Sequence, residues 1–471
     1  MATAVDALNR DAMPSHEGDL TIEGHGFEPI PETARYGSLW RVFTVWFTPN
    51  LVPAAFAIGT LAAADFLQVG FVTGLAAILV GNVVGSLLVA LLGQMGPATG
   101  MAQMPLARLA YGKSIILPGL LNWLSCIGWD GINNVFGAVA LTVIVPAIPF
   151  WAALLIIVVF QGLLGVVGYE AIHTFEKYMA IVLAILFAVV TVAILPKSST
   201  GVARTDGFTG LDQLGAFILF SSITASFVLA WALYASDYSR YLPANSSRSG
   251  IFWRTLIALT LSAGWIELLG LLVADQAKTG PVDVINTLLG GGLVSTLAMI
   301  AIVLGTIAVN ALNDYTGSLS LQAAGVRVRR IYSAITVAAL GFLFTLYLNS
   351  GDFATKFENY LLFISYWIAP WAAVVLADWW LRGRHADVSR LTNFAALPSG
   401  LPGLAALLIG FIASLPFQTS VFGGDIAAST GLPINSIAAN QLHYADFAYL
   451  VGFAVAFVVY WVAGRGAART A

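Results

Sequence analysis

The chain has 471 residues, of which 59% are hydrophobic and only 10% are charged, a balance that excludes an ordinary soluble enzyme. Its 21 basic and 24 acidic side chains give a net charge of -3 without any run of lysine or arginine that could neutralise a phosphate backbone, so nucleic acid is not an expected partner. The single cysteine, Cys126, excludes an internal disulfide and a cysteine-rich metal site.

A polar tail opens the chain. Residues 1–38 carry seven acidic side chains and two arginines before the first apolar stretch, so they resemble neither a secretory signal nor an arginine-rich transit peptide. We expect a cytoplasmic N-terminal tail at 1–38 and a cytoplasmic C-terminal tail at 464–471.

Apolar segments fill the rest of the chain. A bilayer-spanning helix takes about 20 mostly apolar residues, and these segments are too long for barrel strands, so the sequence predicts an all-α, polytopic membrane protein with twelve transmembrane helices. The expected spans are residues 39–64, 68–94, 118–145, 150–169, 174–195, 213–235, 251–274, 293–318, 331–349, 358–381, 397–415 and 445–463.

The spans group into a first five-helix unit at 39–195, a second at 213–381 and two additional helices at 397–463. Spans one and six hold equivalent places in the two units, an arrangement typical of inverted repeats. With the tail in the cytoplasm, 17 of the 21 basic residues lie on that side, which favours a plasma (inner) membrane protein with both termini cytoplasmic. The four basic residues left outside are Lys197, Arg204, Lys278 and Lys356.

The first span is interrupted by Thr48-Pro49-Asn50 and then by Pro53. Each proline lacks a backbone donor, which frees carbonyls that could coordinate a cation or bind a ligand. A plain proline kink is the alternative interpretation. The sixth span is also polar in its middle, with Ser222, Thr224 and Ser226, and interrupted spans mark substrate sites in transporters.

The third span places Trp129 and Asn133 one helical turn apart on a polar, aromatic face. An indole beside a carboxamide suits a planar heterocycle that carries N–H and C=O groups. Ordinary helix packing, with amides bonded between helices, is the alternative.

The eighth span has a similar stripe, made by Thr306, Asn310 and Asn313. Because an unpaired carboxamide in hydrocarbon is costly, we expect the two stripes to face each other or a wet cavity.

Ionisable residues inside spans are functional candidates by default, and here they are Asp130, Glu267 and Asp314. Asp314 and Asp130 are the candidates for coupling, and the sequence does not rank one above the other. All five histidines lie in the tail or in loops, so no metal and no cofactor are expected.

Six motifs in order resemble the nucleobase cation symporter family one, and more closely its purine-cytosine permease branch. They are WFTPN, GMAQMPLARLAYG, GWDGINN, SDYSRYLP, NALNDYTGSLSLQ and ENYLLFISYWIAPW. The resemblance implies a leucine-transporter-type fold of two inverted five-helix repeats plus two C-terminal helices, with alternating access.

The resemblance also implies a base sandwiched between Trp129 and an aromatic residue of span six, which is Phe227 here, with Ser226 beside it. Asn133 would read the edge of the base. Further substrate-binding residues implied by the motifs are Asn310, Asn313, Thr48 and Asn50.

One departure from the family concerns the coupling ion. Sodium-coupled relatives place two hydroxyl residues where this chain has Ala308 and Val309, and a hard cation needs oxygen ligands. We therefore expect H+ rather than Na+ as the coupling ion, although Thr306 could complete a shifted sodium site.

The sequence thus predicts a secondary active transporter that imports cytosine, or purines such as adenine or hypoxanthine, by proton symport in the lipid bilayer. A sodium- or proton-coupled carrier of allantoin, hydantoin, uracil or a related heterocycle is the alternative. A passive channel or facilitator is the alternative of another class, and no enzyme motif is present. A monomer is compatible with the sequence.

Overall fold

All regular structure in the described part of the chain is helical, which confirms the predicted all-α fold. The computed structural model describes residues 28–167, 169–326 and 330–466, and these contain no strand. Residues 1–27 of the predicted N-terminal tail and residues 467–471 of the C-terminal tail lie outside the described residues.

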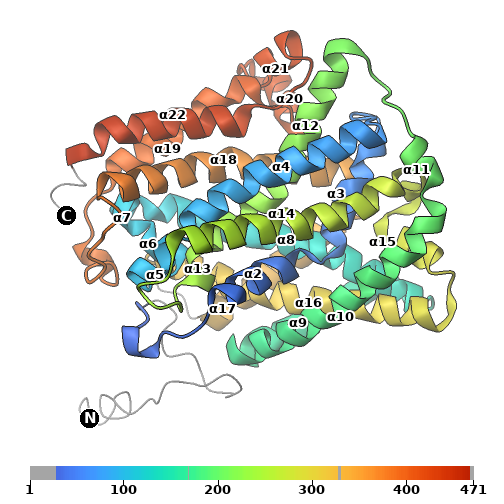
Figure 1. Ribbon diagram of the computed structural model, residues 1–471, viewed down its shortest axis with the longest axis horizontal. Helices are drawn as coiled ribbons and strands as arrows, with labels where there is room; N and C mark the ends of the chain where they lie inside the picture. The colour runs from blue at the N-terminus through green and yellow to red at the C-terminus, as the bar shows by residue number, and fades with distance from the viewer. Residues whose placement is uncertain (1–27, 168, 327–329, 467–471) are drawn as a thin grey trace.

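Two sets of helices, most of them long, follow each other along the chain (Figure 1). The first set is α2 (Leu39–Phe47), α3 (Pro53–Thr60), α4 (Phe71–Leu92), α8 (Ile116–Ile144), α9 (Phe150–Val167) and α10 (Tyr169–Ile194). The second set is α12 (Gly210–Leu229), α13 (Ala235–Ser239), α14 (Arg248–Leu272), α16 (Gly292–Ala323), α17 (Arg330–Leu348) and α18 (Phe353–Leu381). Two more helices, α19 (Leu401–Ser414) and α22 (Ala448–Ala463), follow these sets.

Short helices form the connections between the long ones. They are α5 (Met95–Thr99), α6 (Gln103–Leu106), α7 (Arg108–Tyr111), α11 (Ser199–Ala203), α15 (Pro281–Leu288), α20 (Val421–Thr430) and α21 (Ser436–Gln441).

The predicted spans coincide with the long helices. Among the described residues, seven helices are long and apolar enough to cross a bilayer, and the bent pair of α2 and α3 makes an eighth candidate. Four shorter apolar helices, within α9, α17, α19 and α22, cover the remaining predicted spans. The protein is therefore a multi-pass membrane protein, while the exact number of twelve crossings stays a prediction.

The first span is broken and not merely kinked. Helix α2 ends at Phe47, a 3₁₀ turn covers Thr48–Asn50, and α3 begins at Pro53 in a direction 61° away. Between them Val52 is fully extended, with φ -134° and ψ 152°. The two prolines explain the break, because neither Pro49 nor Pro53 can donate the backbone hydrogen bond that would continue the helix.

The sixth span stays one helical span over Gly210–Ser239, but its helix type changes within it. Helix α12 ends at Leu229, a 3₁₀ helix covers Ala230–Tyr234, and α13 begins at Ala235. A 3₁₀ stretch inside a long helix turns each side chain to a different angle from α-helical spacing, so periodicity does not predict which face these residues occupy.

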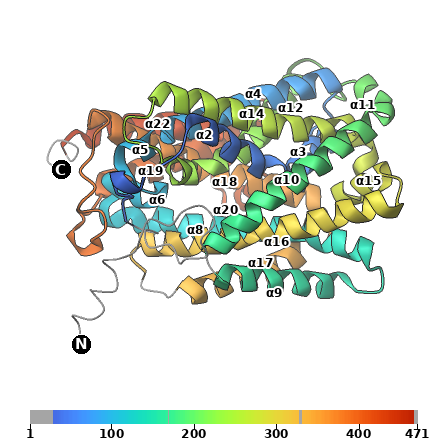
Figure 2. The same ribbon diagram turned by 60° about the horizontal axis from the view of Figure 1, so that its bottom comes forward.

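The long helices form two packed layers. Helices α12 and α14 pack against α4, with α2 and α3 on α14. On the other side α16 packs along the length of α8, and α9 and α17 cover both. Figure 2 shows the layers separately, with α4 and α14 along one edge and α9 and α17 along the other. The candidate site lies between them.

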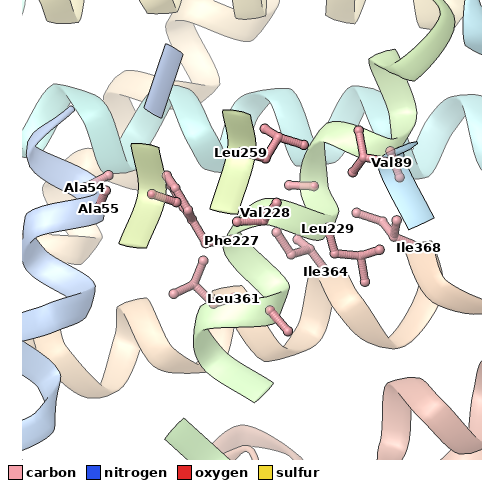
Figure 3. Close-up of a cluster of buried hydrophobic side chains, with 14 of the residues drawn as sticks. Ala54, Ala55, Val89, Phe227, Val228, Leu229, Leu259, Leu361, Ile364 and Ile368 are labelled. Atoms are coloured by element: carbon pink, nitrogen blue, oxygen red, sulfur yellow. The ribbon is translucent and has the colours of Figure 1, made fainter. Parts of the chain in front are cut away.

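Large apolar side chains fill the space around the end of α12. Figure 3 shows Phe227 beside Ala54 and Ala55 of α3, with Leu361 of α18 below it, and all four belong to one buried cluster. Phe227 is only 4% exposed. Its position is therefore set by packing against helices from both ends of the chain.

Candidate functional site

A small cavity of about 50 Å³ lies where the break of the first span and the 3₁₀ stretch of the sixth span meet α8 and α16. It is lined by Pro49, Val52, Ala54, Trp129, Asn133, Phe227, Ala230, Trp231, Tyr234, Val309 and Asn313. Aromatic rings and two carboxamides thus share one small space, which is the mixture of apolar wall and few polar groups that small-molecule sites use.

The two predicted sandwich residues face each other across this space. The ring centroids of Trp129 and Phe227 lie 5.8 Å apart and their planes meet at 70°, an edge-to-face contact. Tyr360 of α18 packs edge-on against the same indole at 5.4 Å. A base stacked between two parallel rings needs about 7 Å between them, twice the carbon contact distance of roughly 3.5 Å, so the two rings must turn parallel and also move apart to admit it.

The two polar stripes of α8 and α16 face each other, as the sequence predicts. The Nδ2 amide of Asn133 donates to Oδ1 of Asn310 at 3.1 Å, and Nδ2 of Asn313 donates to the same oxygen at 3.3 Å. Asn310 itself is fully buried behind the wall. One amide on α16 therefore holds the two amides that line the cavity.

Asn310 is anchored in turn by groups from two other helices. Its Nδ2 donates to the backbone carbonyl of Asp130 at 3.1 Å and to Oε1 of Gln161 on α9 at 3.2 Å. Nε2 of Gln161 lies 3.0 Å from both carboxyl oxygens of Asp130, and Asn134 reaches the same carboxyl at 3.3 Å. The network joins α8, α9 and α16 into one buried unit.

The two coupling candidates differ in their partners. The carboxyl oxygens of Asp130 accept the hydrogen bonds just described from Gln161 and Asn134, whereas the carboxyl of Asp314 lies beside the same Gln161 amide and beside the carboxyl of Asp130. Both side chains are fully buried. The two buried carboxyls therefore interact with each other and with one shared amide.

Four of the eight predicted substrate-binding residues line the cavity, namely Trp129, Asn133, Phe227 and Asn313. Asn310 lies behind them, and Thr48 and Ser226 make bonds within their own helices. The hydroxyl of Thr48 donates to Thr44 O at 3.1 Å and that of Ser226 to Ser222 O at 2.6 Å. Asn50 is buried in the break of the first span. The roles assigned to these residues stay predictions.

Sequence reasoning did not find several residues of the site. Trp231 and Tyr234 line the cavity from the 3₁₀ stretch Ala230–Tyr234. Sequence reasoning could have identified them only by predicting this change of helix type. Gln161 is a polar residue in an otherwise apolar span, and that isolation is a signal the sequence does carry.

The residues at the expected sodium position supply few oxygen atoms that could coordinate the ion. Val309 lines the cavity, Ala308 is buried, and the Thr306 hydroxyl lies 3.4 Å from the Asn133 carbonyl. Among the described residues no group of three or more His, Cys, Asp or Glu side chains could hold a metal ion.

Comparisons with known proteins bear on the fold and the family. A family model described as a permease for cytosine/purines, uracil, thiamine and allantoin matches residues 29–452. The purine-cytosine permease fcyB of Emericella nidulans is 28% identical over 443 residues, covering 88% of this chain and 86% of the relative. The purine-cytosine permease FCY21 of Saccharomyces cerevisiae is 27% identical over 475 residues, covering 94% of this chain and 86% of the relative.

A solved structure of similar fold is that of Mhp1, a nucleobase-cation-symport-1 family transporter in a closed conformation with bromovinylhydantoin bound. It matches with a TM-score of 0.72 at 16% identity and covers 96% of this chain and 97% of its own. This likeness confirms the predicted leucine-transporter-type fold.

Proposed function

Because the chain belongs to the family of permeases for cytosine/purines, uracil, thiamine and allantoin, we propose that it imports a nucleobase by proton symport with alternating access. It is a membrane transporter of small molecules and not an enzyme. The substrates we propose are cytosine and purines such as adenine or hypoxanthine.

One observation supports a flat heterocycle such as a nucleobase as the substrate. The cavity places an aromatic pair, Trp129 and Phe227, against an amide wall formed by Asn133 and Asn313. A flat ring gains from stacking on its faces, and its edge needs donors and acceptors in the same plane. Nucleobases combine both features in one small molecule.

The size of the cavity supports a gated cycle. A cavity of about 150 Å³ is the size that holds benzene, so one of about 50 Å³ is too small for a six-membered ring with substituents. The break between α2 and α3 and the 3₁₀ stretch between α12 and α13 border it, and both interrupt the regular α-helix where the chain can bend. Helix movement at these interruptions would open the site to one side of the membrane at a time.

Proton coupling is supported by the side chains near the cavity. Asp314 lies fully buried on α16 beside the carboxyl of Asp130, and Ala308 and Val309 offer no side-chain oxygen to sodium. We propose H+ as the coupling ion. We also propose that the protein lies in the plasma (inner) membrane with both termini in the cytoplasm, where a monomer is compatible with the sequence.

The test is uptake of radiolabelled cytosine by cells that express the protein, measured at two pH values with and without sodium. Unlabelled purines, pyrimidines, allantoin and hydantoins serve as competitors. We expect competition by cytosine and purines, with uptake that rises in acid and ignores sodium. A strict sodium requirement, or competition by allantoin or hydantoins alone, would contradict the proposal and favour a related heterocycle carrier.

A second arm separates a carrier from a channel. After the proton gradient is dissipated, cells preloaded with unlabelled base should accelerate the entry of labelled base, because a carrier must return its site across the membrane. A passive channel shows no such counterflow.

A further inference from the structure

Glu267 is a fully buried carboxyl that the proposed transport cycle does not use. It lies near the C-terminal end of α14, and its Oε2 accepts a hydrogen bond from Nδ2 of Asn82 on α4. Its Oε1 has no hydrogen-bond partner among the described residues, and neither has Oδ1 of Asn82. A buried acid and a buried amide thus meet between two helices, and each has one oxygen unsatisfied.

An ionised carboxyl at this place would have a single donor. The Nδ2 group of Asn82 has two hydrogens, and it also lies 2.8 Å from the Ile78 carbonyl, so one N–H is left for Glu267. A carboxylate that is taken out of water needs a cation or several donors to offset the loss of its hydration. One N–H does not meet that need.

Charged neighbours do not make up for the missing donors. Among the elements packed against α14, the helices α3, α4 and α11 carry no ionisable side chain. The carboxyl of Glu267 bonds to no charged group in the described residues. The titratable side chains described elsewhere on α14, on the other elements around it and just after its end are Arg41, Lys177, Tyr178, Arg248, Arg254 and Asp275.

A proton on Glu267 would remove the charge and supply a donor. A protonated carboxyl has one O–H donor and keeps a carbonyl oxygen that accepts. The carbonyl oxygen can accept the N–H of Asn82, and the O–H can donate to a neighbouring acceptor. The amide oxygen of Asn82 is such an acceptor, since it lacks a partner and belongs to the side chain that Glu267 already contacts.

Glu267 also lies where α3 packs on α14. A Cβ added at Gly59 of α3 would collide with the backbone carbonyl of Glu267, and one added at Gly270 would collide with the carbonyl of Phe56. The two backbones therefore touch through glycines on either side of this contact. Because α3 contributes Ala54 to the cavity wall, a shift of α14 at Glu267 would reach the cavity through α3.

We propose that Glu267 is a second proton-binding site of this protein, separate from the cavity, which stays protonated at neutral pH and joins α14 to α4 through Asn82. The proton is structural: it is kept through the transport cycle, unlike the proton exchanged at a coupling carboxyl. Its loss in alkali places an uncompensated charge between the two helices and loosens the surface on which α3 packs.

Infrared spectroscopy of the purified protein tests the protonation directly. A protonated carboxyl has a C=O stretching band that neither a carboxylate nor a carboxamide shares. At about pH 7 we expect this band in the spectrum of the unaltered protein minus that of Glu267→Gln. Glutamine has the shape of the protonated acid and keeps a donor and an acceptor, so the variant should fold. A difference spectrum without the acid band, or a Glu267→Gln protein that does not fold, overturns the proposal.

Thermal unfolding in detergent tests the structural role. The folded protein holds a proton that the unfolded chain releases at neutral pH, so linkage makes stability fall as the pH rises. Between about pH 6 and 9 we expect the midpoint of the unaltered protein to fall by about 3 °C or more beyond that of Glu267→Gln. Equal slopes for the two proteins would mean that the proton does not support the fold.

Two further variants complete the test. Glu32→Gln makes the same chemical change at an exposed site and should keep the pH slope of the unaltered protein, and an equal flattening there would contradict the assignment to Glu267. Asn82→Leu removes the amide partner, so the acid band should persist at a changed frequency. An unchanged band in Asn82→Leu would refute the pairing of Glu267 with Asn82.

Uptake separates this proton from the coupling proton. We expect Glu267→Gln to keep the stimulation of cytosine uptake by acid, and to lose less uptake than the unaltered protein when the pH is raised to about 9. Loss of the acid stimulation in Glu267→Gln would show that Glu267 carries the coupled proton and would overturn the structural role. An unaltered protein that takes up no base would refute the proposed function alone, because the infrared and thermal results do not depend on uptake.

Discussion

The indole Nε1–H of Trp231 donates to the side-chain oxygen of Asn50 at 3.0 Å. Asn50 lies in the break between α2 and α3, and Trp231 lies in the 3₁₀ stretch between α12 and α13. The amide of Asn50 also donates to the Trp46 carbonyl at 2.9 Å and to the Ser262 hydroxyl on α14 at 3.0 Å. One buried carboxamide thus joins both interrupted helices to a third helix.

The hydrogen bond between Trp231 and Asn50 predicts that these two residues act as a pair. We expect Asn50→Leu and Trp231→Phe each to lower the maximal rate of uptake by about tenfold, since each removes the same buried hydrogen bond and leaves its partner unsatisfied. The double variant should be little worse than either single one, because residues that share an interaction are not additive. Uptake kinetics per mole of membrane protein, measured for the two single variants and the double variant, complete this double-mutant cycle. Fully additive losses would show that the two interruptions move independently.

The second prediction concerns the stacking pair. Replacing Trp129 with Ala removes one face of the proposed sandwich and should abolish saturable uptake, while Trp129→Phe should retain a part of it with a raised KM. Trp253 on α14 is 54% exposed and offers a matched control, since Trp253→Ala loses an indole far from the cavity wall. Radiolabelled uptake and membrane abundance are measured together. Full uptake by Trp129→Ala would disprove the sandwich.

A third prediction separates the two buried aspartates. Asp314→Asn should flatten the pH profile of uptake between about pH 5 and 8 and leave base exchange intact, because a carboxamide fills the same buried space but cannot carry the proton. Asp130→Asn should instead raise the KM, because the carboxyl of Asp130 receives Gln161 and so helps to hold Asn310. Initial rates across pH, with counterflow as the second readout, distinguish the two. An unaltered pH profile in Asp314→Asn would remove this residue from proton coupling.

The sequence predicts those parts of the site that follow regular helical spacing. Trp129 and Asn133 lie one turn apart on α8, and Asn310 and Asn313 lie one turn apart on α16, so their shared faces and their meeting could be anticipated. The long apolar segments likewise predict the helices, because only helices satisfy the backbone in lipid.

The remaining parts depend on tertiary contacts that no local pattern carries. Trp231 and Tyr234 face the cavity only because α12 gives way to a 3₁₀ helix, and nothing in the AWALY segment has a proline to announce that change. Asn50 stays a predicted substrate residue, and no local pattern predicts that its amide bonds to three helical segments. Which of several buried amides meets a ligand is decided by the neighbours it finds in the fold.

The last prediction tests the contact that positions α12 beside α4. A Cβ added at Gly81 would collide with the Thr224 hydroxyl and with the backbone carbonyl of Ser221, and a backbone atom cannot swing aside as a side chain can. Gly81→Ala should therefore destabilise the protein by ~1–3 kcal/mol through overpacking, and should also disturb Phe227 one turn further along α12. Gly162→Ala on α9 is the control, because a Cβ there meets nothing within 4 Å. Thermal unfolding of the purified protein in detergent compares the two. We expect a lower midpoint for Gly81→Ala alone, and equal midpoints would mean that α4 and α12 can separate without cost.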